Sequence, residues 1–107
     1  MKDLELVVKI LDEKLAEDLV IIDFEGKGSI ADCFIICTAK NERHSDSLVD
    51  YLKEGLEGKV KIHHIDDEDP AWQIIDLGDI LVHIFLKETR ERYQLERLWS
   101  DYKVESL

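Results

Sequence analysis

The sequence has 107 residues, of which 45% are hydrophobic and 36% charged, with one proline and five glycines. We expect one domain over residues 1–107, because this composition excludes collagen-like and broadly disordered chains. The 14 basic and 25 acidic residues leave a formal net charge of -11, which disfavours a DNA or RNA backbone as direct partner and favours a basic protein surface.

No segment predicts export or membrane insertion. The first residues lack the apolar stretch of a signal peptide, and no apolar run approaches the roughly 20 residues of a membrane helix. We therefore expect a cytoplasmic protein without a membrane partner. Cys33 and Cys37 lie four residues apart on a predicted strand, about 13 Å at 3.3 Å per residue, and are predicted to be reduced thiols.

The first half of the chain predicts two helices and two strands. Apolar residues recur at three- and four-residue spacing over residues 3–17, which indicates an amphipathic helix. Strands follow at 19–24 and 32–38, and the second is apolar on both alternations, as expected of a strand buried on both faces. A second helix begins after the N-cap residue Asn41 and ends at Gly58.

The second half predicts three strands and a last helix. Residues 60–65 form a strand, and the acidic loop 66–70 follows because its proline cannot remain in a sheet. Strands at 72–77 and 80–87 form a hairpin whose two turn residues, Gly-Asp, suit a type II′ turn. The apolar stripe of the C-terminal helix is formed by Leu95, Leu98, Trp99 and Tyr102. This order predicts an α/β fold with a mixed five-stranded sheet and flanking helices.

The register of the hairpin sorts its side chains onto two faces. The nearly aliphatic face, suited to lie under helices, carries Gln73, Ile75, Leu77, Ile80, Val82 and Ile84. The other face mixes aromatic, polar and ionisable groups, a composition typical of a binding surface. We interpret five of its residues as candidate partner-binding residues: Trp72, Ile74, Asp76, His83 and Phe85. The alternative is that the C-terminal helix covers this face with Trp99 and Tyr102.

Catalytic and metal-binding motifs are weak. His63 and His64 are adjacent on a predicted strand and point to opposite faces, so they do not readily share one metal ion. Gly28 and Ser29 precede a strand, as in nucleotidyltransferases, but Asp32 lacks the second carboxylate that such enzymes use to hold magnesium. We expect no enzyme activity, no metal and no cofactor. The alternative is a nucleotidyltransferase-like enzyme or nucleotide-binding module around these three residues.

Several segments together resemble the ribosomal silencing factor family, also called Iojap proteins. They are residues 32–38, 43–44, 72, 76–85 and 88–99. The resemblance implies a fold related to nucleotidyltransferases without their active site, and a homodimer. It implies binding to ribosomal protein fourteen of the large subunit, which blocks subunit joining when nutrients are scarce. It also implies that the surface around Trp72 contacts this protein. Cys33, Ala39 and Asp67 depart from the usual family residues, which concerns local contacts and not the fold.

Overall fold

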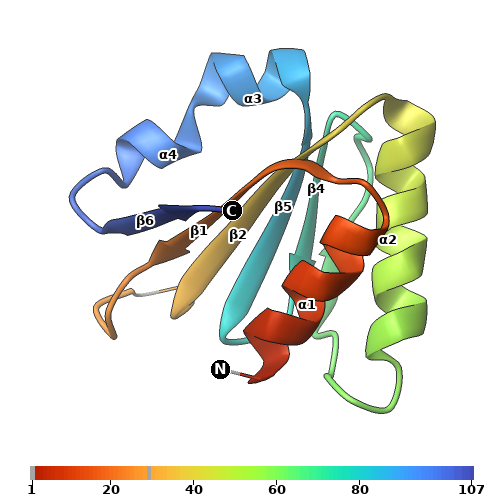
Figure 1. The fold of residues 1–107 in the computed structure, drawn as a ribbon, viewed down its shortest axis with the longest axis horizontal. Helices are drawn as coiled ribbons and strands as arrows, with labels where there is room; N and C mark the ends of the chain where they lie inside the picture. Colours follow the sequence, from red (N-terminus) through yellow and green to blue (C-terminus); the bar gives the residue numbers. More distant parts are fainter. Residues whose placement is uncertain (1, 29) are drawn as a thin grey trace.

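The computed structural model describes residues 2–28 and 30–107, which form one mixed six-stranded sheet with helices on both faces (Figure 1). In chain order the elements are α1 (Lys2–Glu13), β1 (Glu17–Asp23), β2 (Cys33–Ala39), α2 (Glu42–Leu56), β3 (His64–Asp66), β4 (Trp72–Asp76), β5 (Ile80–Leu86), α3 (Lys87–Tyr93), α4 (Leu95–Leu98) and β6 (Lys103–Ser106). The strand order is β3-β4-β5-β2-β1-β6, and β2 and β5 are the parallel pair. The predicted α/β class and mixed sheet are confirmed.

The structure corrects the predicted elements in three places. The strand predicted at 60–65 is the three-residue β3, because Val60 and Ile62 pack against the core from an irregular segment instead. The predicted C-terminal helix is shorter than its apolar stripe, because α4 ends at Leu98 and both Trp99 and Tyr102 follow it. The left-handed Gln94, with a φ of 47°, separates α4 from a further helix, α3, which the sequence did not predict. The sheet has a sixth strand, β6, which the sequence did not predict because its four residues are all exposed and show no apolar alternation.

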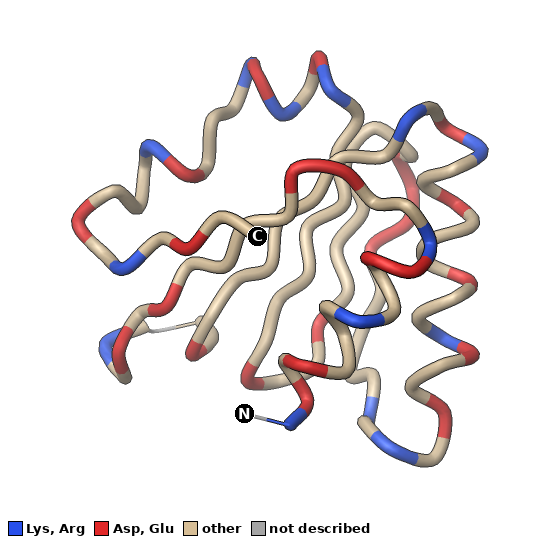
Figure 2. Tube along the Cα trace, in the orientation of Figure 1, with Lys and Arg blue, Asp and Glu red and all other residues tan. Residues whose placement is uncertain are grey.

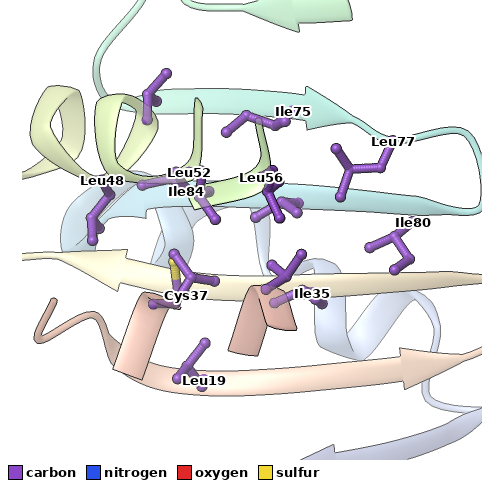
Figure 3. Packing of buried hydrophobic residues seen from close by; sticks show 14 of the residues in the cluster. Leu19, Ile35, Cys37, Leu48, Leu52, Leu56, Ile75, Leu77, Ile80 and Ile84 are labelled. Atoms are coloured by element: carbon purple, nitrogen blue, oxygen red, sulfur yellow. The ribbon is translucent and has the colours of Figure 1, made fainter. Parts of the chain in front are cut away.

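The larger core lies between the sheet and helices α1 and α2. The N-terminal end of α2 is fixed as predicted, because the Asn41 side chain accepts a hydrogen bond from the His44 backbone N–H at 2.8 Å. From residue 48 onward, every fourth residue of α2 is a leucine whose side chain packs against the sheet. Figure 3 shows these leucines beside the buried side chains of the strands. The row is Leu48, Leu52 and Leu56, and the sheet residues below include Ile35, Ile75 and Ile84.

The predicted register of the β4–β5 hairpin is confirmed. The facing residues are Trp72 and Phe85, Ile74 and His83, and Ile75 and Val82. The turn closes with the Leu77 N–H donating to the Ile80 carbonyl at 2.9 Å. Gly78 has a φ of +89°, the sign that a type II′ turn requires at its first central residue. The aliphatic face therefore lies under α1 and α2, and the mixed face lies on the other side of the sheet.

Truncation of Val82 tests this register. Val82 is fully buried in the larger core, so Val82→Ala deletes two buried methyl groups and should lower the free energy of unfolding by about 1–3 kcal/mol. Urea denaturation measures this loss. Val104→Ala deletes the same groups from a 40% exposed residue of β6 and should change stability by less than about 0.5 kcal/mol. Equal losses in the two variants would contradict the assigned faces.

Candidate functional site

Trp72 begins β4 and is half-buried on the face opposite α1 and α2. Its indole Nε1–H donates to Nδ1 of His83 at 3.1 Å. Its ring centroid lies 4.8 Å from that of Phe85 on β5 and 4.8 Å from that of Tyr93 on α3. Strand β5 and helix α3 thus hold the indole in one orientation while part of it stays accessible to a partner. A pre-oriented aromatic side chain loses little conformational entropy on binding.

His83 supports Trp72 from within the aromatic cluster. The residue is 5% exposed, and its ring packs 4.7 Å from that of Phe34. Because Nδ1 accepts the proton of Trp72, a neutral His83 carries its own proton on Nε2. Burial lowers the pKa of His83 to about 4, since desolvation disfavours the charged imidazolium. Among the residues that the structure describes, Nε2 has no hydrogen-bond partner.

The buried His83 makes stability depend on pH. The unfolded chain binds a proton at this residue near pH 6.5, whereas the folded protein does so only near pH 4. The free energy of unfolding should therefore fall as pH drops from about 6.5 to about 4, by at most about 1.4 kcal/mol per pH unit from this residue. Urea titrations of the wild type and His83→Gln at several pH values measure the contribution. Identical pH slopes in the two proteins would contradict it.

The five predicted residues divide into two groups. Trp72, Ile74 and Asp76 alternate along β4, and each is partly exposed on the same face. His83 and Phe85 lie beside them on β5 but are only 5% and 1% exposed. The surface available for direct contact is therefore narrower than the sequence predicted, and the two β5 residues lie in position to support it.

Tyr93 completes the surface, and sequence reasoning missed it. It is 51% exposed and stands at the last position of α3, with its ring against Trp72. The spacing of apolar residues in the sequence could not reveal this contact. The helix ends at Tyr93, and the left-handed Gln94 changes the direction of the chain there. We call Trp72, Ile74, Asp76 and Tyr93 the β4–α3 surface.

The alternative reading, in which the C-terminal segment covers the mixed face, holds for one end of the sheet. Trp99 and Tyr102 pack edge-on against Phe24, with ring centroids 5.1 and 5.0 Å away, and Trp99 also contacts Phe34. These contacts lie over β1 and β2. Trp72 and its neighbours on β4 remain only partly covered. Among the described aromatic side chains of α3 and α4, Tyr93 is the one that packs against Trp72.

Arg90 fixes the position of α3 over the sheet. One guanidinium nitrogen donates to the Asp18 carbonyl at 2.7 Å and to Thr38 Oγ1 at 2.8 Å. Its Nε donates to Glu96 of α4 at 3.0 Å, within an ion pair whose arginine side chain is 11% exposed. A single side chain therefore connects β1, β2, α3 and α4, and so positions the helix that carries Tyr93.

An acidic loop precedes the β4–α3 surface in the chain. Residues 66–69 are all acidic and exposed, and Pro70 and Ala71 separate them from the start of β4. The Asp69 carbonyl accepts the backbone N–H of Trp72 at 3.1 Å, so this loop is tied to the first residue of the strand. Figure 2 shows further acidic residues, with Lys and Arg between them, along both long helices, which lie on the other face of the sheet. The field around the β4–α3 surface is thus suited to a positively charged partner.

Two of the three residues proposed for nucleotide chemistry, Gly28 and Asp32, line different cavities. Asp32 is exposed and lines a cavity of about 310 Å³ with Asp23 and Lys103, while Ser29 lies outside the described residues. Within residues 2–28 and 30–107, no group of three His, Cys, Asp or Glu side chains is placed to hold a metal ion. Cys33 and Cys37 are free and buried, and burial raises their pKa values to about 11 and about 12. No helix in the described chain has the length and apolarity to span a membrane.

Comparison with known proteins gives one consistent result. The family model described as ribosomal silencing factor during starvation matches residues 1–107. Ribosomal silencing factor RsfS of Halalkalibacterium halodurans is 38% identical over 100 residues, covering 92% of this chain and 86% of the relative. The Bacillus subtilis RsfS is 33% identical over 106 residues, covering 97% and 90%. A crystal structure of a Chromobacterium violaceum protein superimposes with a TM-score of 0.86 at 26% identity, covering 92% and 84%.

Proposed function

Because the chain belongs to the ribosomal silencing factor family, we propose that it represses translation by binding the large ribosomal subunit. The contact is made with ribosomal protein fourteen, and it blocks joining of the two subunits under nutrient limitation. The protein acts in the cytoplasm by occupying a surface, and this requires neither catalysis nor a cofactor. The free protein is a homodimer.

The observation that carries this proposal is the β4–α3 surface. Trp72 is half-buried, held by a hydrogen bond to His83 and packed between Phe85 and Tyr93. Tryptophan and tyrosine are enriched among the few residues that dominate binding energy at protein interfaces. Ile74 and Asp76 extend the same face along β4, while His83 and Phe85 support it from β5. The five residues predicted from the sequence thus contribute in two ways, by contact and by support.

Charge supports a basic protein as the partner. The chain has a formal net charge of -11, and the acidic residues 66–69 adjoin Trp72. Complementary charge mainly raises the association rate. At 0.1 M salt, the attraction between exposed charges is largely screened beyond about 10 Å. The β4–α3 surface itself is largely apolar and aromatic, so we assign affinity to that surface and steering to the carboxylates of residues 66–69.

Repression by exclusion needs only affinity and bulk. The molecule measures 33 × 33 × 24 Å along its principal axes, so it extends well beyond the β4–α3 surface. A body of this size on the face of the large subunit that meets the small subunit would prevent their close approach. No bond is made or broken in this mechanism, so the effect should follow occupancy alone.

Two measurements test the proposal together. Co-sedimentation with purified large subunits, and with isolated ribosomal protein fourteen, should show direct binding without added nucleotide. Light scattering of mixed subunits should then show that joining is inhibited in proportion to occupancy. Binding that leaves subunit joining unchanged would contradict exclusion, and nucleotide-dependent turnover by the protein would favour the enzymatic alternative.

A further inference from the structure

Helices α1 and α2 leave one side of the sheet uncovered. Helix α2 contacts β2, β4 and β5, and α1 contacts α2 and β1. In Figure 1 both helices lie away from β6, whose four residues are all exposed. A helix with its side chains is about 10–12 Å wide and neighbouring strands are about 4.8 Å apart, so two helices cover about four or five strands. The six-stranded sheet therefore has an uncovered strip beside α1, along β1 and β6.

The uncovered strip forms a groove between α1 and β6. Glu105 of β6 lies opposite Ile21 of β1, which packs in the larger core, so both side chains are on the face that carries α1. Two cavities lie along this groove, one of about 530 Å³ lined by Leu19 and Leu107, and one of about 310 Å³ lined by Ile21 and Glu105. Residues of α1 form one wall of both cavities. We call this space the α1–β6 groove, and its apolar lining includes Leu4, Val8, Ala16, Leu19, Ile21 and Leu107.

The floor of the α1–β6 groove is apolar and its rim is acidic. Val8 and Ala16 are half-buried and Leu107 is 56% exposed, which leaves apolar surface open to a partner. The exposed charged residues around the larger cavity are Glu5, Lys9, Asp12 and Asp18. Three carboxylates thus stand beside one ammonium group, and in the described part of the chain none of the four takes part in an ion pair. The rim therefore keeps an excess of negative charge.

We propose that the α1–β6 groove binds a basic amphipathic helix of another protein. The apolar stripe of this helix lies against Val8, Leu19 and Leu107, and its Lys or Arg side chains lie beside the carboxylates of the rim. Helix-in-groove binding of this kind uses apolar residues at positions i, i+3, i+4 and i+7 of the bound helix. The acidic rim disfavours nucleic acids and anionic membranes, because both carry dense negative charge.

The position of the groove selects a helix over an extended strand. The groove lies on a face of the sheet, where the backbone of β1 is already paired with β2 and β6. A strand laid on this face finds no backbone partners for its own N–H and C=O groups, whereas a helix satisfies these groups internally. Helix α1 has 12 residues, and a bound helix that runs along all of it is about 18 Å long.

The α1–β6 groove and the β4–α3 surface lie on opposite faces of the sheet. Val8 and Leu19 belong to the larger core under α1 and α2, whereas Trp72 packs with the aromatic cluster on the other side. Strands β6 and β4 are also separated by β5, β2 and β1. A helix in the groove therefore leaves the surface assigned to ribosomal protein fourteen free. The inference goes beyond the proposed function, since the protein can hold a second basic partner while it is bound to the ribosome.

Titration with a synthetic peptide tests the inference. The probe is a peptide of about 14 residues with leucine at i, i+3, i+4 and i+7 spacing and lysine elsewhere. Amide chemical shifts of the isotope-labelled protein should change in α1, β1 and β6. The dissociation constant should be about tens of micromolar, because a single helix buries less than the roughly 1,600 Å² of a standard interface. A control peptide of the same composition without helical periodicity should bind about five-fold or more weakly, since its leucines do not share one face.

Two pairs of variants locate the contact. Leu107→Ser removes an exposed apolar side chain of the groove and should weaken peptide binding about ten-fold, whereas Leu98→Ser changes a similarly exposed leucine of α4 and should leave the affinity unchanged. Asp12→Lys reverses one charge of the rim and should weaken binding about five-fold. Glu13→Lys makes the same change of charge on the side of α1 that adjoins α2, and should have little effect. Thermal unfolding checks that all four variants are folded.

Each result supports or overturns the groove as the site. Shift changes along α1, β1 and β6 that only the groove variants weaken would support it. Equal binding of the two peptides, or equal effects within each pair of variants, would show unspecific attraction to an acidic protein and overturn it. Shift changes confined to the β4–α3 surface, or a peptide that binds only by dissociating a dimer, would also overturn it. None of these results alters the proposed ribosomal contact, which substitution of Trp72 tests separately.

Discussion

Trp72→Ala is expected to weaken binding to the large ribosomal subunit by about 2 kcal/mol or more, roughly 30-fold in affinity. The change removes a pre-oriented indole from the β4–α3 surface and leaves Tyr93 without its packing partner. The fold should suffer less than binding does, because Trp72 is half-buried and the larger core lies on the other face of the sheet. Co-sedimentation gives the affinity, and thermal unfolding gives the stability.

Two controls make the Trp72 result specific. Tyr51→Ala removes an exposed aromatic residue from α2, on the other side of the sheet, and should leave binding unchanged. Trp72→Phe keeps an aromatic ring but loses the N–H that bonds His83, and should bind with intermediate affinity. Unchanged binding by a folded Trp72→Ala protein would remove this surface from the proposal. Lost binding with a collapsed melting temperature would return Trp72 to a purely structural role.

Arg90→Leu is expected to lower the free energy of unfolding by about 3 kcal/mol. Hydrogen bonds to charged groups contribute about 1.5–3 kcal/mol each, and part of this loss is recovered as the exposed groups become hydrated. The variant leaves the Asp18 carbonyl, Thr38 Oγ1 and Glu96 without their donor. Amide hydrogen exchange should accelerate first in α3 and α4, and urea denaturation measures the total.

Conservative and remote changes define what Arg90 contributes. Arg90→Lys keeps the charge but lacks the planar set of donors, so it should restore only part of the stability. Arg92→Leu removes an exposed cation of the same helix and should stay within about 0.5 kcal/mol of the wild type. Loss of ribosome binding at temperatures where Arg90→Leu remains folded would show that α3 must be fixed for Tyr93 to act. Equal amide exchange rates in the wild type and Arg90→Leu would contradict the conclusion that Arg90 fixes α3 and α4 to the sheet.

Local signals were sufficient for most of the fold. The Asn41 cap and the leucine row of α2 depend only on neighbouring residues, and the Gly78–Asp79 turn fixed the hairpin register in the same way. β6 carries no such signal, because its position depends on a long-range pairing with the free edge of β1. The break after Tyr93 rests on a non-glycine residue with positive φ, which composition does not indicate.

The candidate surface shows the same division. Strand alternation placed Trp72, Ile74 and Asp76 on one face, as observed. The degree to which that face is covered depends on α3, which Arg90 holds through residues distant in sequence, Asp18 and Thr38. Sequence reasoning therefore identified the face but could not distinguish the exposed residues of β4 from the buried residues of β5.

The parallel pairing of β2 with β5 has a consequence for folding rate. Cys33 pairs with Ile80 and Ala39 with Leu86, so all of residues 40–79 lie between the two central strands. The β1–β2 and β4–β5 pairs can form early from near neighbours, but joining them requires closure of this long loop. Non-local pairings of this kind slow folding towards the millisecond-to-second range. We expect refolding to be limited by the step that brings the two halves of the sheet together.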